Sequence, residues 1–226
     1  LMIDLDPQGN TTSGLGMEVD DKSIYEVIMG RMKLTDVMEE TEFKNLSIAG
    51  SDVRLANAEL ELVEVEKREY RLKTAVQSVQ QDFDFIFIDC PPSLGLLTIN
   101  ALGAADSVLI PIQCEYYALE GVASLMNTIS RVKKTINPHL EIEGVLLTML
   151  DGRTNLGLQV VDEVKKHFKK QVYATVIPRS VRLGEAPSHG EPIHVYDKRS
   201  AGCVAYVNLA KEVLKRNNIK VKEFKL

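Results

Sequence analysis

The sequence predicts a doubly wound α/β domain with a mostly parallel central sheet flanked by helices, and two observations support that prediction. Short apolar, β-branched runs alternate along the chain with longer segments of helical character. The apolar runs are continuous, which is typical of strands buried on both faces of a parallel sheet. The runs lie at Leu1–Leu5, Leu46–Ala49, Phe85–Asp89, Val108–Ile112, Val145–Met149 and Tyr173–Ile177.

The segments between these runs predict the helices that cover the sheet. Ser23 and Glu26 have the spacing of a capping box, which opens a helix by satisfying its first backbone N–H groups. Leu55–Val79 is rich in Glu, Lys, Arg and Leu and predicts one long helix. Further helices are predicted at Leu119–Thr135, Leu156–Phe168 and Ala201–Arg216, and residues 217–226 form a basic, solvated tail.

The composition is that of a globular protein with one domain over residues 1–226. The mass of 25.2 kDa and the 45% apolar content are sufficient for a full core. No apolar run approaches the roughly 18 residues that span a bilayer. The three cysteines are scattered, which argues against a zinc site and indicates a reduced, cytoplasmic protein. Because the net charge is -5, any DNA binding must rest on a local basic patch.

The opening residues predict that the domain is N-terminally incomplete. Leu1–Leu5 reads as a strand already in progress, with no lead-in before it. A buried strand of this kind normally follows another strand and a helix. We therefore expect one βα unit to be missing, on the order of 30 residues.

Ligands of an open parallel sheet bind outside the carboxyl ends of its strands, so polar residues at those ends are candidates for the site. Asp4 and Asp6 follow the first apolar run, where Pro7 and Gly9 turn the chain. A phosphoryl-transfer site needs such carboxylates to hold a magnesium-bound water and to orient an attacking water. The alternative is that these residues only make a turn.

A second candidate is the Asp that ends the run Phe85–Asp89. Four apolar residues followed by Asp89 make a Walker B pattern, in which the carboxylate reaches magnesium directly or through water. Pro91 and Pro92 then prevent the strand from continuing. The pattern is also common in ordinary strands. Cys90 reads as a small buried residue rather than a nucleophile, because no His lies near it in sequence.

A third candidate is the segment from Val176 to Gly190, which follows the last apolar run and is dense in Arg, Pro and Gly. Arginines on a strand-end loop can meet the phosphates of a nucleotide or of DNA. The alternative is a surface loop whose arginines are solvated or paired with neighbouring acids.

Taken together, these segments resemble the ParA/Soj family of chromosome- and plasmid-partitioning ATPases. The matching segments, in the family's order, are DLDPQGN, FIDCPPS, PIQCEYYALEG, TMLDGRTNLG and IPRSVRLGEAPSHG. The resemblance runs from Leu1 to about Leu214. It implies a P-loop NTPase fold that uses ATP and Mg²⁺, and it does not distinguish chromosome from plasmid cargo.

The resemblance also implies roles for individual residues of the nucleotide site. Asp6 corresponds to the residue that positions the hydrolytic water. Asp4 lies near magnesium, and Asp89 supports magnesium through water. Pro178 belongs to the loop that packs against adenine.

The DNA-binding side of the family is implied by two arginines. Arg153 and Arg182 match residues of the basic surface that grips DNA without reading its sequence. Pairing with acids such as Asp151 and Glu185 is the alternative for these two side chains. The family acts as an ATP-bound homodimer in the cytoplasm, on nucleoid DNA, and a ParB-like centromere-binding protein stimulates its hydrolysis.

One departure from the family pattern affects all of these implications. The phosphate-binding Walker A loop of the KGGVGKT type occurs nowhere in the 226 residues, and Ser13–Gly16 lacks the Lys-Ser/Thr that would replace it. We therefore expect this polypeptide alone to be catalytically inactive. A nucleotide-free module that binds DNA or ParB is one alternative. A MinD-like positioning ATPase is another, although Asn218–Leu226 lacks the bulky apolar face of a membrane-binding helix.

Overall fold

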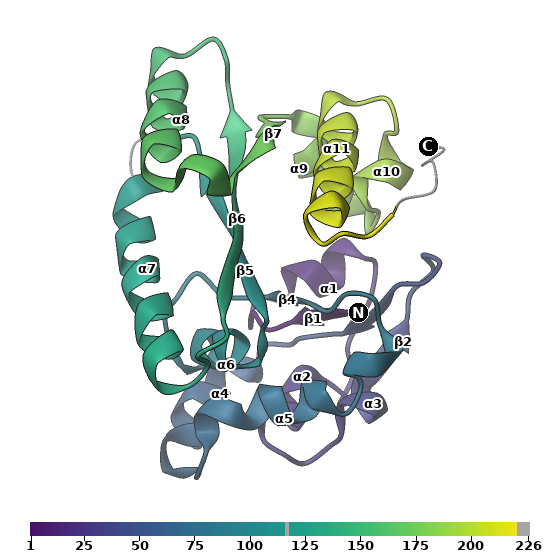
Figure 1. The fold of residues 1–226 in the computed structure, drawn as a ribbon. Helices are drawn as coiled ribbons and strands as arrows, with labels where there is room; N and C mark the ends of the chain where they lie inside the picture. Colours follow the sequence, from purple (N-terminus) through teal and green to yellow (C-terminus); the bar gives the residue numbers. More distant parts are fainter. Residues whose placement is uncertain (116–117, 221–226) are drawn as a thin grey trace. The chain divides into compact units, whose positions relative to one another are not determined.

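The computed structural model describes residues 1–115 and 118–220, and its backbone follows the predicted alternation of strands and helices (Figure 1). The chain forms two compact units. Unit 1 comprises Leu1–Asp106 and Thr128–Leu140, and unit 2 comprises Ser107–Asn127 and Glu141–Leu226. The strands accordingly pair in a four-stranded and a three-stranded sheet. The predicted α/β fold with mostly parallel strands is confirmed.

The sheet of unit 1 has the strand order β2-β3-β1-β4. Strands β1 (Met2–Asp4), β3 (Ser47–Ala49) and β4 (Phe87–Asp89) are parallel, as predicted. Strand β2 (Met38–Glu40) pairs antiparallel with β3 and was not predicted. Its two glutamates are exposed, so its sequence carries no buried-strand signal.

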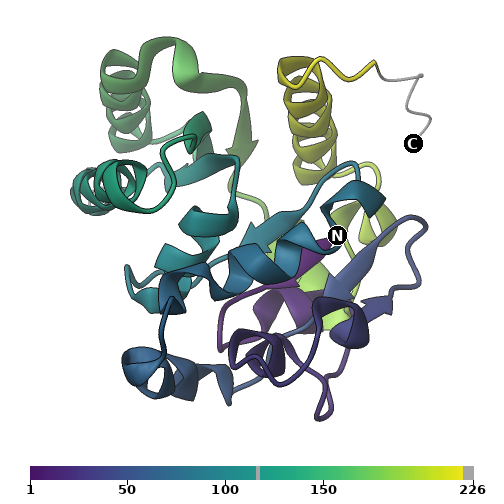
Figure 2. The same ribbon diagram turned by 60° about the horizontal axis from the view of Figure 1, so that its bottom comes forward.

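The helices of unit 1 are short and surround one apolar core, and they come to the front in Figure 2, in purple to blue. Fully enclosed side chains come from β1 (Ile3) and from helices that follow it in sequence, among them Ile28 and Leu72. The helices are α1 (Asn10–Gly14), α2 (Ile24–Ile28), α3 (Leu34–Val37), α4 (Leu55–Glu61), η1 (Leu62–Glu64), η2 (Arg68–Tyr70), α5 (Arg71–Gln77), η3 (Gln80–Asp82) and α6 (Leu96–Ala104).

The single long helix predicted over Leu55–Val79 is wrong. The helical path ends after η1, where Val65 is extended, and Lys67 adopts a left-handed φ of 55°. A left-handed residue cannot continue a right-handed helix. The break turns the chain so that both Leu62 and Leu72 are buried in the same core.

Helix α2 begins after Ser23 as predicted, but the capping box does not form. The Ser23 side chain makes no cap hydrogen bond. The Glu26 carboxylate instead lies 3.5 Å from both the Arg31 and the Arg54 guanidinium groups. The Glu26 carboxylate, which a capping box would use to accept from the Ser23 N–H, is therefore engaged in ion pairs instead.

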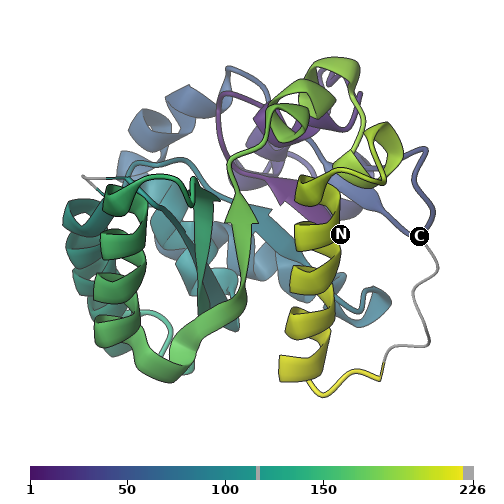
Figure 3. The same ribbon diagram turned by 90° about the horizontal axis from the view of Figure 1, so that it is seen from above.

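The sheet of unit 2 is entirely parallel, with β5 (Ser107–Gln113), β6 (Glu141–Leu150) and β7 (Val172–Pro178) in that order. Helices α8 and α11 lie on opposite sides of this sheet (Figures 1 and 3). The three long helices predicted in this half of the chain are all present. The helical segments are α7 (Ala118–Thr135), which continues into unit 1, α8 (Asn155–Phe168), η4 (Lys169–Gln171), α9 (Val181–Glu185), η5 (Ala186–His189), α10 (Ile193–Tyr196) and α11 (Ala201–Arg216).

Helix α11 is fixed to the sheet through Gly144 on β6. A Cβ at Gly144 would lie 2.5 Å from the buried Tyr173 ring and 2.6 Å from Arg216 Nη1. Arg216 stacks 3.7 Å from the Tyr173 ring centroid and donates to the carbonyls of Glu143 and Gln171. Only glycine leaves room for this contact, so the end of the last helix is tied to β6 and β7.

Of the predicted basic tail, residues 217–220 follow α11, and residues 221–226 lie outside the described residues. Across the ranges 1–115 and 118–220, no helix is long and apolar enough to cross a membrane.

Candidate functional site

The carboxyl ends of β1 and β4 place two carboxylates side by side. The two strands are parallel neighbours, and Asp4 is the register partner of Asp89. The ladder continues one residue further, where the Leu5 N–H donates to the Asp89 carbonyl at 2.8 Å. Asp4 and Asp89 therefore lie at the carboxyl ends of neighbouring strands in the same sheet.

The Asp4 side chain is completely buried, and it accepts hydrogen bonds from two residues of its own unit. Its Oδ2 accepts from the Thr12 N–H at 2.8 Å and from the Thr12 hydroxyl at 2.7 Å, and its Oδ1 accepts from the Asp6 N–H at 3.2 Å. Burial raises the pKa of Asp4, while the bonds from Thr12 and Asp6 oppose that shift. Asp4 thus holds together the strand, the following turn and the start of α1.

Asp6 lies in that turn and shapes it with its own oxygens. Its Oδ1 accepts from the Gln8 N–H at 3.0 Å, and its carbonyl accepts from the Gly9 N–H at 3.0 Å. Gly9 has a φ of 63° and sits where a Cβ would be 3.2 Å from the Ser51 carbonyl. Glycine is needed there on both counts. The half-buried Asp6 is therefore presented on a turn of defined shape.

Asp89 is the exposed carboxylate of the pair. Its Oδ2 accepts from the Thr11 hydroxyl at 2.6 Å. Burial, together with the negative charges of Asp89 and Asp6, raises the pKa of the neighbouring Cys90 to about 12. Cys90 therefore stays a neutral thiol, in agreement with its interpretation as a packing residue.

Thr12 is a residue of the site that sequence reasoning missed. It is buried, and its hydroxyl donates to Asp4 while accepting from the Ser51 N–H at 3.0 Å. Thr11, which was also missed, caps Asp89. The available signal was a pair of threonines directly after an acidic turn, opening the next helix.

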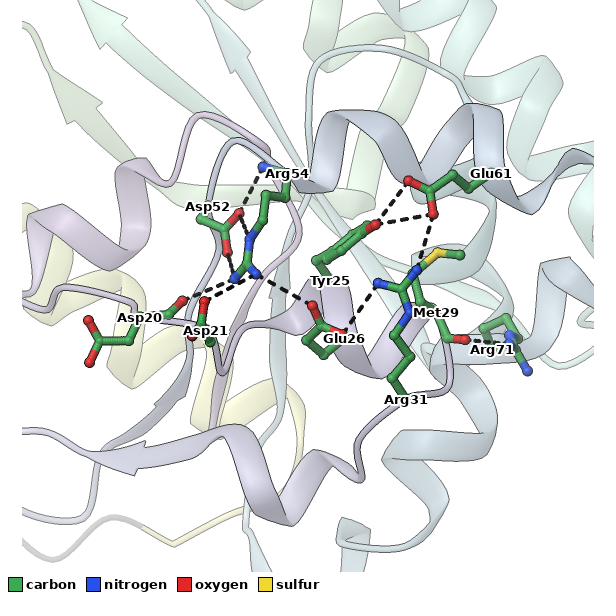
Figure 4. A network of polar contacts seen from close by, with 10 residues as sticks. All are labelled: Asp20, Asp21, Tyr25, Glu26, Met29, Arg31, Asp52, Arg54, Glu61 and Arg71. Carbon is green, nitrogen blue, oxygen red and sulfur yellow. Dashed lines mark hydrogen bonds and ion pairs between the residues drawn. The ribbon is translucent and has the colours of Figure 1, made fainter.

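The turn that carries Ser51 is itself held by a polar network (Figure 4). Arg54 donates to both oxygens of Asp52, at 2.9 Å from Nε and 2.8 Å from Nη2. The Arg54 and Arg31 guanidinium groups lie 5.7 and 5.2 Å from the Tyr25 ring centroid. The Tyr25 hydroxyl donates to Glu61 at 2.9 Å. This network fixes the end of β3 beside the buried Thr12.

Pro178 lies in unit 2, at the carboxyl end of β7. The next residue, Arg179, donates its N–H to the Leu150 carbonyl at 3.0 Å and pairs with Glu115. The strand ends of unit 2 surround a cavity of about 980 Å³. Its lining residues are Pro111, Ile112, Gln113, Cys114, Glu115, Met149, Asp151, Thr154, Leu156 and Arg179.

Arg153 and Arg182 are both engaged in ion pairs within unit 2. Arg153 donates from Nε and Nη2 to the two oxygens of Asp151, at 2.9 and 2.8 Å, and holds the pKa of Asp151 well below its usual range. Arg182 Nη1 donates to Glu185 at 2.9 Å. The pairing alternative named above is thus what the structure contains, although both arginines remain more than half exposed.

The acids at the β1–β4 edge suit a magnesium ion that is bound together with phosphates. The described part of the chain holds no group of three or more His, Cys, Asp or Glu side chains arranged to enclose a metal ion. Magnesium, however, usually binds one or two carboxylates and completes its shell with water and substrate phosphates. The exposed Asp89 carboxylate suits that role, whereas the enclosed Asp4 carboxylate beside it already accepts three hydrogen bonds.

Comparisons with known proteins identify the class and then the family. A family model described as an AAA domain matches residues 1–142. The crystal structure of cobyrinic acid a,c-diamide synthase from Mycobacterium smegmatis with bound ADP and magnesium is 35% identical. It has a TM-score of 0.83, and the match covers 96% of this chain and 82% of that one.

The sequence relatives are more specific. The sporulation initiation inhibitor protein Soj of Bacillus subtilis is 58% identical, over 94% of this chain and 85% of its own length. The chromosome partitioning protein ParA of Myxococcus xanthus is 50% identical, over 97% of this chain and 78% of its own length. The chain belongs to the Soj/ParA family of chromosome-partitioning ATPases, as the motifs predicted.

Proposed function

We propose that this chain works as the body of a DNA-partitioning ATPase whose Mg²⁺–ATP is handled at the β1–β4 edge. The observation that supports the proposal most is the register pairing of Asp4 with Asp89, each capped by a threonine hydroxyl of α1. The related Mycobacterium smegmatis structure contains ADP and magnesium. A nucleotide with its magnesium ion is therefore the ligand we assign to this edge.

The surroundings of the three acids divide the work between them. Asp89 is exposed and suited to support magnesium through water. Asp4 already accepts three hydrogen bonds, so we assign it to orienting the turn beside the metal. Asp6 is assigned to positioning the attacking water. When bound, magnesium neutralises charge on the phosphates. Pro178 is assigned to the adenine contact on the evidence of its motif.

We further propose that the 226 residues turn over little or no ATP by themselves. No glycine-rich segment among them carries the Lys-Ser/Thr that lets a phosphate loop bind a nucleotide. An extended polypeptide, in which a strand–loop–helix segment containing KGGVGKT is joined to Leu1, should be active. We expect steady-state phosphate release with Mg²⁺–ATP from the extended polypeptide, and release at background level from the 226 residues.

The same assay separates the alternatives. Turnover by the 226-residue chain that disappears on Asp6→Ala would contradict the requirement for the added loop. Turnover that survives Asp6→Ala would come from a contaminant. An extended polypeptide that folds and binds DNA but hydrolyses no ATP would favour a nucleotide-free DNA- or ParB-binding module.

The DNA-binding part of the proposal rests on Arg153 and Arg182. Both follow strand ends of unit 2 and expose more than half of their side chains. Contacts from such arginines to phosphate carry no sequence information. We therefore propose nonspecific binding of nucleoid DNA in the cytoplasm by an ATP-bound homodimer, with a ParB-like protein as the stimulating partner.

Arg153→Ala and Arg182→Ala should each weaken binding of a random-sequence duplex. Each should also lower the log–log salt slope by roughly one unit per lost phosphate contact. Fluorescence-anisotropy titrations at several salt concentrations measure both quantities, on the chain alone and on the extended polypeptide with Mg²⁺–ATP. Basal ATP turnover of the extended polypeptide should be unchanged. Isotherms identical to wild type for both variants would place the DNA surface elsewhere.

A further inference from the structure

We propose that Asp151 and Glu185 belong to the DNA-binding surface as internal competitors for the phosphates. This inference rests on the proposed binding of DNA by Arg153 and Arg182, and it concerns how that binding is regulated. Each arginine is held by a carboxylate of its own unit, and a DNA phosphate has to displace that carboxylate. The acids thereby set the affinity of the surface for duplex DNA.

The first pair uses the part of Arg153 that a phosphate would need. Two parallel hydrogen bonds run from Nε and Nη2 to the two oxygens of Asp151, at 2.9 and 2.8 Å. This fork arrangement is also the preferred way for a guanidinium group to bind a phosphate. The Asp151 Oδ1 additionally accepts from the Arg153 N–H at 3.1 Å. Asp151 therefore occupies the binding edge of Arg153 while the remainder of that side chain faces solvent.

The second arginine is shared between two acids. Arg182 Nη1 donates to Glu185 Oε2 at 2.9 Å, and its Nε lies 3.5 Å from Asp197 Oδ2. The Tyr196 hydroxyl also donates to Glu185 Oε2, at 3.2 Å, and so helps to hold that carboxylate in place. The Glu185 oxygen that pairs with Arg182 is thus also held by the Tyr196 hydroxyl.

The charges in these clusters explain why the competition matters. The two guanidinium groups are contacted by three carboxylates, those of Asp151, Glu185 and Asp197, which leaves a formal charge of -1. These carboxylates therefore cancel the positive charge with which the two arginines would attract a polyanion. A duplex presents many closely spaced phosphates, which together can displace the carboxylates from both arginines, whereas a single small anion cannot. Duplex DNA is therefore the partner that we assign to this surface.

Neutralising the competitors should strengthen DNA binding. Asp151→Asn and Glu185→Gln keep the size of each side chain and an oxygen that accepts from Arg153 N–H or the Tyr196 hydroxyl. In each variant a DNA phosphate no longer has to break an exposed ion pair. Each variant should therefore bind a random-sequence duplex about two- to fivefold more tightly. The double variant should show roughly the product of the two effects.

Two controls separate release of the arginine from a general change of charge. Glu141→Gln makes the same charge change at the opposite end of β6 and should alter affinity much less. In the Arg153→Ala background, Asp151→Asn should lose most of its effect. The titrations use the chain alone and the extended polypeptide with Mg²⁺–ATP, with circular dichroism to establish that each variant is folded.

The outcomes distinguish this inference from the function on which it rests. If Arg153→Ala and Arg182→Ala leave binding unchanged, the proposed DNA surface is wrong. If those variants weaken binding while Asp151→Asn and Glu185→Gln do not strengthen it, only the competition is wrong. Equal strengthening by Glu141→Gln, or by Asp151→Asn without Arg153, would also overturn the competition and leave net charge as the cause.

Discussion

Asp6→Ala is expected to lower the steady-state ATP turnover of the extended polypeptide by about 100-fold, which is the usual contribution of a residue that handles a proton or water in the transition state. Asp6 is presented on a turn fixed by its own contacts to Gln8 and Gly9 and by the Asp6 N–H bond to Asp4. Phosphate release at saturating Mg²⁺–ATP gives the turnover. Nucleotide binding should change far less, because the substitution removes no phosphate contact.

Two controls define what that result means. Asp6→Asn preserves the shape and a hydrogen-bond acceptor for Gln8, so a loss similar to that of Asp6→Ala assigns the effect to the charge. Asp82→Ala removes an exposed acid from η3, before the amino end of β4, and should leave turnover within about twofold of wild type. A turnover for Asp6→Ala within threefold of wild type would rule out Asp6 as the water-positioning residue.

Thr12→Val is expected to reduce the free energy of unfolding by about 2–4 kcal/mol, because it removes a hydrogen bond to a buried carboxylate and leaves a buried backbone N–H unpaired. The lost bonds are those from Thr12 Oγ1 to Asp4 at 2.7 Å and from the Ser51 N–H to Thr12 Oγ1 at 3.0 Å. Valine matches threonine in size, so packing is preserved. Urea denaturation of the 226-residue chain measures the difference.

Thr12→Ser supplies the matched comparison. It retains the hydroxyl and should recover most of the stability that Thr12→Val loses, apart from the methyl group. A loss below 0.5 kcal/mol for Thr12→Val would be within the range of an ordinary surface substitution. That result would show that the hydroxyl does not hold Asp4 and the Ser51 turn together.

The predictable parts of this fold are those fixed by local pattern. Continuous apolar runs located β1 and β4, and the acids at their carboxyl ends could be named as site candidates because ligands of a parallel sheet bind there. Helix α6 was not predicted, because its buried residues, among them Leu97 and Leu102, leave little amphipathic contrast. The break between Leu62 and Leu72 depends on burial in one core, which periodicity alone does not report.

Sequence reasoning proposed acids for the site and did not name the hydroxyls that contact them. Asp4 and Asp89 stand at recognisable strand ends, whereas the roles of Thr11 and Thr12 depend on contacts across the fold, such as Thr11 to Asp89. The pairing of Arg153 with Asp151 was an open alternative in the sequence. Two residues of opposite charge separated by one position pair only when the backbone turns, as it does between β6 and α8.

We propose that the β1–β4 edge receives the metal of the bound nucleotide. Mn²⁺, a paramagnetic substitute for Mg²⁺, tests it by broadening the amide resonances of residues near the metal in the ¹⁵N-labelled extended polypeptide with ATP. We predict selective broadening at Asp4–Thr12 and at Asp89–Cys90, and its loss in Asp89→Asn. Sharp resonances at both segments, with broadening elsewhere under saturating Mn²⁺–ATP, would contradict the assignment.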